Sequence, residues 1–175
     1  MDFNADHFLL FELPPAFRLD ASLLDQRYLE LQLRVHPDRF ANAGEADRRL
    51  SLQWATRVNE AYQTLKKPLP RAKYLLHLAG HDIGSENNAL MPAAFLIEQM
   101  EWREAVEEAR AAGNHHELEH LHHRLQRDML ERYDELALLL DDRHDLEQAA
   151  DRVRRLMFLA KLLAEIEDAM AECEE

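Results

Sequence analysis

The sequence predicts an all-α protein with an N-terminal helical hairpin and a C-terminal antiparallel three-helix bundle. Apolar residues recur every three or four positions along most of the chain, as they do on one face of an amphipathic helix. No segment shows convincing period-two alternation, so we expect no sheet. The four glycines and six prolines among the 175 residues fall between the periodic segments, where helix breakers are expected.

Two long helices should form the hairpin. Asp20 is a suitable N-cap for the first helix, which must end at Pro37, and Pro68 ends the second. Their apolar positions have helical spacing and are Leu24, Tyr28, Leu31 and Val35 in the first helix, and Leu50, Trp54, Val58, Ala61 and Leu65 in the second. A short helix with the sequence RAKYLLHLA then precedes Gly80.

Charge divides the chain near residue 80. Residues 1–80 carry 11 Lys and Arg against 10 Asp and Glu, whereas residues 81–175 carry 10 against 24, a net charge of −14. We therefore expect one module over 1–80, a turn-rich linker over 81–92 and a second module over 93–175. The acidic half would repel a phosphate backbone, so nucleic acid is not an expected partner.

Three helical segments make up the second module, over about 93–112, 115–140 and 145–171. Short connections between amphipathic helices favour an antiparallel bundle. The expected core positions are Leu118, Leu121, Leu125, Met129, Tyr133, Leu136 and Leu140 in the middle helix, and Val153, Leu156, Ala160, Leu163 and Met170 in the last.

Composition favours a cytoplasmic protein. The first residues contain no basic segment followed by an apolar run, and no apolar stretch reaches the roughly 20 residues that span a bilayer. The single cysteine, Cys173, cannot form an internal disulfide or supply a cysteine-rich metal site. We expect no cofactor and no membrane association.

The sharpest local signal is the turn His36-Pro37-Asp38 between the two hairpin helices. Proline has no backbone N–H and disfavours helical geometry in the residue before it. The turn should therefore project an imidazole and a carboxylate into solvent. The alternative interpretation is that the tripeptide only ends a helix. The surrounding sequence has to decide between this structural role and a functional motif.

With its flanks, this turn resembles the J-domain of the DnaJ co-chaperones. The flanking segments are FLLFELP at 8–14 and NEAYQTL at 59–65. Three further segments, PRAKYLL at 70–76, FLIEQME at 95–101 and VRRL at 153–156, resemble the HscB branch of J-proteins, which acts in bacterial iron-sulfur cluster assembly. The resemblance implies a J-domain over 1–80 and a scaffold-binding bundle over 93–175.

The resemblance also implies a function without catalysis in this chain. An HscB protein delivers the iron-sulfur scaffold IscU to an ATPase chaperone of the HscA/DnaK class and stimulates ATP hydrolysis by that chaperone. His36, Pro37 and Asp38 would make the stimulating contact, and the basic residues Arg27 and Arg34 of the preceding helix would add to it. That basic face is thin, since Leu33 stands where the family often has a basic residue.

Helical geometry separates two faces of the segment 93–112. At about 100° per residue, Phe95, Trp102, Val106 and Ala109 share one face, which we assign to the core. The opposite face should expose an apolar patch edged by carboxylates, and Phe158 of the last helix should point away from its own core stripe. The resemblance makes this a scaffold-binding surface of Leu96, Ile97, Met100, Glu101, Glu104, Glu108 and Phe158. The alternative is that the apolar members complete a broader core.

A zinc-dependent hydrolase is the second functional hypothesis. His116-Glu117-Leu118-Glu119-His120 matches the helical H-E-x-x-H motif, in which two histidines bind zinc and the glutamate acts as a general base. Leu118 belongs to the core stripe of the bundle, so His116 and His120 should lie on the solvent side. A third ligand is not identifiable from the sequence.

Overall fold

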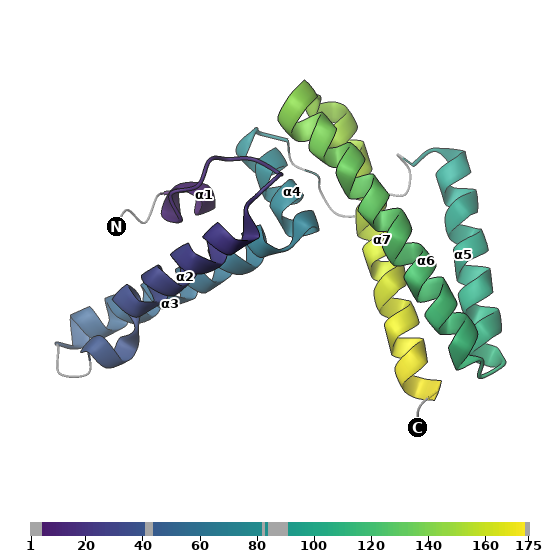
Figure 1. Ribbon diagram of the computed structural model, residues 1–175, viewed down its shortest axis with the longest axis horizontal. Helices are drawn as coiled ribbons and strands as arrows, with labels where there is room; N and C mark the ends of the chain where they lie inside the picture. The colour runs from purple at the N-terminus through teal and green to yellow at the C-terminus, as the bar shows by residue number, and fades with distance from the viewer. Residues whose placement is uncertain (1–4, 41–43, 82, 84–90, 174–175) are drawn as a thin grey trace. The chain divides into compact units, whose positions relative to one another are not determined.

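The computed structural model describes residues 5–40, 44–81, 83 and 91–173, and it contains no strand among them (Figure 1). The predicted all-α class is therefore confirmed. The chain divides into two compact units, Met1–Ala79 and Gly80–Glu175. Most of the predicted linker, namely residue 82 and residues 84–90, lies outside the described residues.

The first unit is a helical hairpin with flanking short helices. Its elements are α1 (His7–Leu10), α2 (Ala21–Val35), the 3₁₀ helix η1 (Pro37–Phe40), α3 (Glu45–Lys66) and α4 (Pro68–Leu78). Asp20 caps α2 as predicted, because its carboxylate accepts hydrogen bonds from the backbone N–H groups of Ser22 and Leu23. The helix α4 begins earlier than predicted, since Pro68 fits the first helical position.

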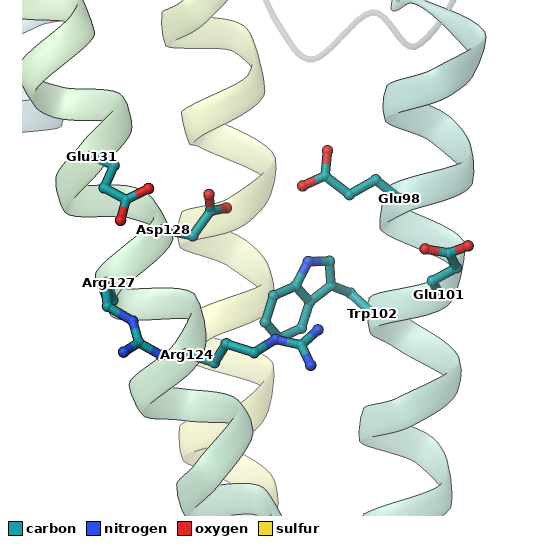
Figure 2. Close-up of a pocket in the computed structure, with 7 residues that line it drawn as sticks. All are labelled: Glu98, Glu101, Trp102, Arg124, Arg127, Asp128 and Glu131. Carbon is teal, nitrogen blue, oxygen red and sulfur yellow. The ribbon is translucent and has the colours of Figure 1, made fainter.

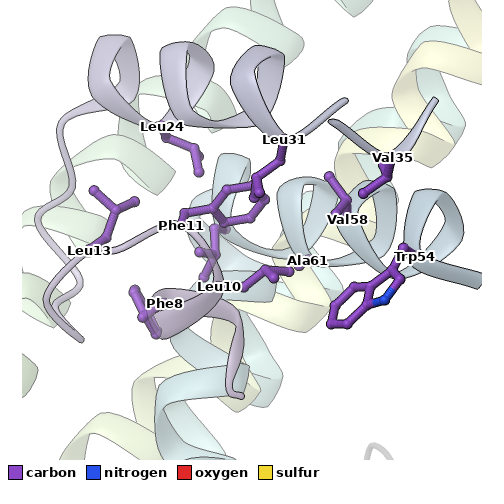
Figure 3. Close-up of a cluster of buried hydrophobic side chains, with 11 residues drawn as sticks. Phe8, Leu10, Phe11, Leu13, Leu24, Leu31, Val35, Trp54, Val58 and Ala61 are labelled. Atoms are coloured by element: carbon purple, nitrogen blue, oxygen red, sulfur yellow. The ribbon is translucent and has the colours of Figure 1, made fainter. Parts of the chain in front are cut away.

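Residues from the N-terminal segment complete the core of the hairpin. The rings of Phe8 and Phe11 are almost fully buried, and Figure 3 shows Phe11 among side chains of α2 and α3. Together they form one cluster of Phe8, Leu10, Phe11, Leu13, Leu24, Leu31, Val35, Trp54, Val58, Ala61 and Leu65. This packing fixes α2 against α3 and so determines where the turn between them lies.

One predicted core position of α3 is wrong. Leu50 is exposed, and the neighbouring Ser51 is buried in its place. The Ser51 hydroxyl donates a hydrogen bond of 2.6 Å to the backbone oxygen of Val35, at the end of α2. A buried hydroxyl is tolerated when it has such a partner, and here the partner is a helix-end carbonyl that has no acceptor role within its own helix.

The short helix α1 is held onto α3 and α4 by polar contacts. The His7 ring stacks on the Tyr74 ring with 4.2 Å between the centroids, and the His7 backbone N–H donates to the Tyr74 hydroxyl at 3.0 Å. Arg57 of α3 donates to the backbone oxygen of Ala5 at 2.6 Å. Burial, together with the positive charge of Arg57, lowers the pKa of His7 below its ordinary value of 6.5.

The lowered pKa of His7 predicts an acid-sensitive first unit. Below about pH 6.5 the unfolded chain takes up a proton that the folded chain resists, so the free energy of unfolding should fall as the pH falls. Above that pH, His7 should contribute no pH dependence. Urea unfolding of the His7→Phe variant, which keeps a stacked ring, should show a flatter dependence between about pH 5 and 6.5. An equal slope in both proteins would contradict this role for His7.

The second unit is a three-helix bundle of α5 (Ala93–Ala111), α6 (His115–Ala137) and α7 (Leu146–Cys173). Figure 1 shows the three long helices running along one another. Gly113 has a φ of 59° in the short α5–α6 connection, a conformation that glycine adopts without strain. The predicted segments match these helices to within a few residues.

A π-helical segment, η3 (Leu138–Arg143), follows α6 and was not predicted from the sequence. It buries both Leu139 and Leu140, and His144 ends it in the left-handed conformation. Both leucines of this wider last turn therefore add to the core of the bundle. Across the ranges described above, no helix combines the length and apolar content needed to cross a bilayer.

Candidate functional site

The His-Pro-Asp turn is exposed and its backbone departs from the helix at His36. His36 has φ −58° and ψ 128°, the extended conformation expected before a proline. Its side chain is 53% exposed and that of Asp38 is 91% exposed. The prediction that this turn presents an imidazole and a carboxylate to solvent is therefore confirmed.

Contacts within the turn orient these two side chains. The Asp38 backbone N–H donates to Nδ1 of His36 at 3.3 Å, and the same nitrogen lies 3.6 Å from the Asp38 carboxylate. With Nδ1 as the acceptor, a neutral His36 ring carries its proton on Nε2. The backbone N–H of Arg39 donates to the His36 oxygen at 3.0 Å and closes the turn.

The end of α2 behind the turn is tied down by two side chains. Ser51 binds the Val35 carbonyl, as described above, and Nη1 of Arg39 donates to the Leu33 carbonyl at 3.0 Å. These bonds satisfy carbonyls that a helix end leaves without partners. Sequence reasoning missed Ser51 because it is polar, although Ser51 lies three residues before Trp54, which lies four residues before Val58, and this is helical core spacing.

The predicted basic flank of the turn is weaker than two arginines suggest. Arg27 lies 3.2 Å from the Glu12 carboxylate and 3.5 Å from that of Glu30, so its charge is largely compensated. Arg34, in the last turn of α2, is exposed. Of the two arginines, Arg34 is therefore the better placed to attract an acidic partner.

The helix α5 has the two faces that its sequence predicts. Phe95, Trp102, Val106 and Ala109 are buried. On the other side, Ile97 is 57% and Met100 is 70% exposed, and Leu96 is half-buried. Exposed carboxylates surround them. We call this surface the α5 outer face, formed by Leu96, Ile97, Met100, Glu101, Glu104 and Glu108.

Phe158 does not belong to this surface, and the prediction that it is exposed is wrong. Its side chain is only 7% exposed and packs edge-on against Phe95, with 6.3 Å between the ring centroids. The predicted stripe of α7 was also wrong in part, because Ala160, Leu163 and Met170 are only half-buried. Instead α7 contacts both α5 and α6, so it buries a wide stripe that includes Leu159, Leu162 and Ile166.

The buried position of Phe158 predicts a large effect on stability. Phe158→Ala should destabilise the bundle by about 3–5 kcal/mol, the usual cost of a large cavity. Leu163→Ala, at a half-buried position, should cost less than half as much. Urea unfolding followed by Trp102 fluorescence in a Trp54→Phe background measures both. A larger loss for Leu163→Ala would contradict the observed packing of α7.

Ion pairs hold both edges of α5 against the rest of the bundle. Arg132 of α6 bridges Glu98 of α5 at 2.6 Å and Asp128 of its own helix at 2.9 Å. On the other edge, Arg110 pairs with Glu172 of α7 at 2.6 Å. These ion pairs and the buried face hold α5 in place against α6 and α7, so the α5 outer face lies on a helix of fixed position within the bundle.

A polar groove of about 400 Å³ runs between α5 and α6 beside the outer face. Figure 2 shows Trp102 pointing toward α6, where the Arg124 guanidinium lies 4.1 Å from the centre of its ring. The groove is lined by Glu98, Glu101, Trp102, Arg124, Arg127, Asp128 and Glu131. Carboxylates and guanidinium groups dominate this lining, unlike the mostly apolar sites that bind cofactors.

The histidine-rich start of α6 does not form a zinc site in the described part of the chain. His116 and His120 are exposed, and Nδ1 of His120 lies 3.6 Å from the Glu117 carboxylate. Among the described residues, no group of three or more His, Cys, Asp or Glu side chains is placed to hold a metal ion. A catalytic zinc usually takes three protein ligands, so the hydrolase hypothesis is not favoured.

Comparison with known proteins points to one family over the whole chain. Residues 91–167 match the HSCB C-terminal oligomerisation domain. A "Co-chaperone protein HscB homolog" from Aromatoleum aromaticum is 56% identical over 174 residues, which are 99% of this chain and 98% of the relative. The protein of the same name from Paraburkholderia xenovorans is 53% identical and covers 93% of each chain.

Solved structures agree with these relatives. The chaperone HscB from Vibrio cholerae superposes with a TM-score of 0.84 at 39% identity, over 97% of this chain and 99% of that one. Human co-chaperone protein HscB gives a TM-score of 0.90 at 30% identity, over 95% of this chain and 83% of that one. The arrangement of helices and the sequence therefore identify the same relatives.

Proposed function

The chain belongs to the HscB family of co-chaperones, and from this premise we propose that it delivers the iron-sulfur scaffold IscU to the ATPase chaperone HscA and stimulates its ATP hydrolysis. Membership supports a co-chaperone role in iron-sulfur cluster assembly, with a chaperone partner of the HscA/DnaK class. The hydrolysing site belongs to that partner. The lone thiol of Cys173 fits a reducing compartment, so we assign this role to the cytoplasm.

One observation carries the proposal, namely the turn of His36, Pro37 and Asp38, whose imidazole and carboxylate are exposed beside a helix end fixed by side-chain hydrogen bonds. An imidazole and a carboxylate that are exposed and already oriented can bind a partner without much further loss of conformational freedom. We propose that they contact the chaperone directly. Arg34 adds a positive charge beside them, and Arg27 adds less because of its contacts with Glu12 and Glu30.

The α5 outer face is the proposed binding site for the scaffold. Ile97 and Met100 supply exposed apolar surface, and a carboxylate rim encloses it, as is common at protein interfaces. The rim of Glu101, Glu104 and Glu108 favours a partner with a basic surface. Phe158 is assigned a supporting role, since it packs beneath α5 against Phe95.

An ATPase assay tests the proposal. The rate of HscA should be measured alone, with this chain, with IscU, and with both. If the chain brings the scaffold to the chaperone, both together should raise the rate by more than the sum of the separate effects. A rate that this chain leaves unchanged, with and without IscU, would refute the proposed function.

A further inference from the structure

Two adjacent leucines on α2 are exposed close to the His-Pro-Asp turn. Leu29 is 61% and Leu33 is 70% exposed. They are four residues apart, so their side chains lie within about 40° of each other around the helix. Single exposed leucines are ordinary on a protein surface, whereas an adjacent pair makes a small patch whose burial by a partner is favourable.

This leucine pair is continuous with the turn. Leu33 lies in the last turn of α2, three residues before His36. Arg39, directly after the turn, donates from Nη1 to the Leu33 backbone oxygen at 3.0 Å. A partner that covers His36 and Asp38 can therefore extend onto Leu33 and then onto Leu29, one helical turn further along α2.

Compared with burial of the leucine pair, the charges of α2 offer a partner little electrostatic attraction. The helix contains two acidic and two basic residues, so its net charge is zero. Asp25 is bound by the Tyr62 hydroxyl at 3.0 Å and by the Lys66 ammonium. Arg27 lies between the carboxylates of Glu12 and Glu30, as described above. Charges compensated at such short distances produce only a weak field at the surface of a partner, which leaves the exposed Arg34 as the main source of electrostatic attraction on α2.

We propose that Leu29 and Leu33 form an apolar contact with the ATPase chaperone, so that α2 docks mainly by burying this leucine pair. The inference rests on the proposed function and names residues of the chaperone interface beyond the turn. A second copy of this chain is a weaker candidate for the partner, because two leucine side chains expose far less than the roughly 1,200 Å² that a specific interface buries. The leucine pair therefore has to be part of a larger binding surface, and the adjoining His-Pro-Asp turn provides that surface.

The first test removes the leucine pair. The variant Leu29→Ala/Leu33→Ala should raise the concentration of this chain at half-maximal stimulation of HscA by about tenfold, a common effect of removing apolar anchors. The maximal rate should be retained, because His36 and Asp38 are intact. Leu9→Ala is the matched control, since Leu9 is 63% exposed but lies on α1. It should leave the half-maximal concentration unchanged.

A second variant separates apolar from electrostatic docking. Leu33→Lys should weaken stimulation if the chaperone buries Leu33, and should strengthen it if the chaperone attracts basic residues of α2. For the wild-type chain, raising the salt from about 50 mM to about 300 mM should change the half-maximal concentration by less than about threefold. Circular dichroism verifies that each variant is folded, and Leu33→Lys alone decides the question if the double variant loses helicity.

The outcomes distinguish the leucine contact from the proposed function. Wild-type stimulation with an unchanged half-maximal concentration in the double variant would overturn the leucine contact and leave the proposed function intact. Stronger stimulation by Leu33→Lys would likewise overturn the leucine contact and leave the proposed function intact. A wild-type chain that fails to stimulate HscA at all would overturn both proposals.

Discussion

Replacing His36 with Gln, or Asp38 with Asn, should reduce the stimulation of HscA by more than about tenfold. Both side chains are exposed and oriented by contacts within the turn, so each change removes a charged or hydrogen-bonding group from the proposed contact. Loss of one partner from a hydrogen-bonded pair at an interface costs about 2–5 kcal/mol, which is more than tenfold in affinity. The ATPase rate at saturating IscU measures the effect.

Stability should hardly change in these variants. Substitutions of exposed side chains usually alter the free energy of unfolding by less than about 0.5 kcal/mol, so melting curves should match that of the wild-type chain. Glu60→Gln, an exposed substitution on α3, is the matched control and should stimulate normally. Wild-type stimulation by His36→Gln and Asp38→Asn would show that the turn is only a structural connection between α2 and α3.

The double variant Ile97→Ala/Met100→Ala should weaken the binding of IscU by about 3 kcal/mol, or about a hundredfold. These are the most exposed apolar side chains of the α5 outer face, and they lie at its centre within the carboxylate rim. Leu130→Ala is the control, because Leu130 is comparably exposed at 65% but lies on α6. Isothermal titration measures the affinity for IscU of the wild-type chain, the double variant and the Leu130→Ala control.

Charge reversal at the rim should have a different signature. Glu101→Lys with Glu104→Lys should slow association and reduce its dependence on salt, because rim charges mainly steer the encounter. Stopped-flow mixing at two salt concentrations measures this. An unchanged affinity in a folded Ile97→Ala/Met100→Ala variant would remove the α5 outer face as the scaffold site.

Short-range signals in the sequence were sufficient to predict where the helices begin and end and where the exposed turn lies. Asp20 caps α2, α3 ends before Pro68, and the bundle helices begin and end close to the predicted residues. Such signals depend on hydrogen bonds and steric limits within a few residues of the helix end, so they can be read without knowledge of the partner elements. The exposed turn at His36 and Asp38 follows from the same local rules.

For α5, which packs against both α6 and α7, periodicity also identified the core. The stripe of α5 at Phe95, Trp102, Val106 and Ala109 was predicted and is buried. On α3 the prediction was wrong by one residue, since Ser51 is buried in place of Leu50. The prediction preferred Leu50 because serine is polar, and a serine is suited to the core only when an acceptor such as the Val35 carbonyl lies within hydrogen-bond distance.

The burial of Phe158 depended on long-range packing alone. On α7 a single helical stripe predicts a narrow core face, but α7 packs against both α5 and α6 and therefore buries residues well outside that stripe. The same packing explains why Ile97 and Met100 remain exposed, since the ion pairs and aromatic contacts of α5 engage its other sides. Periodicity describes one helix at a time, whereas the number of neighbours around a helix decides how much of its surface is buried.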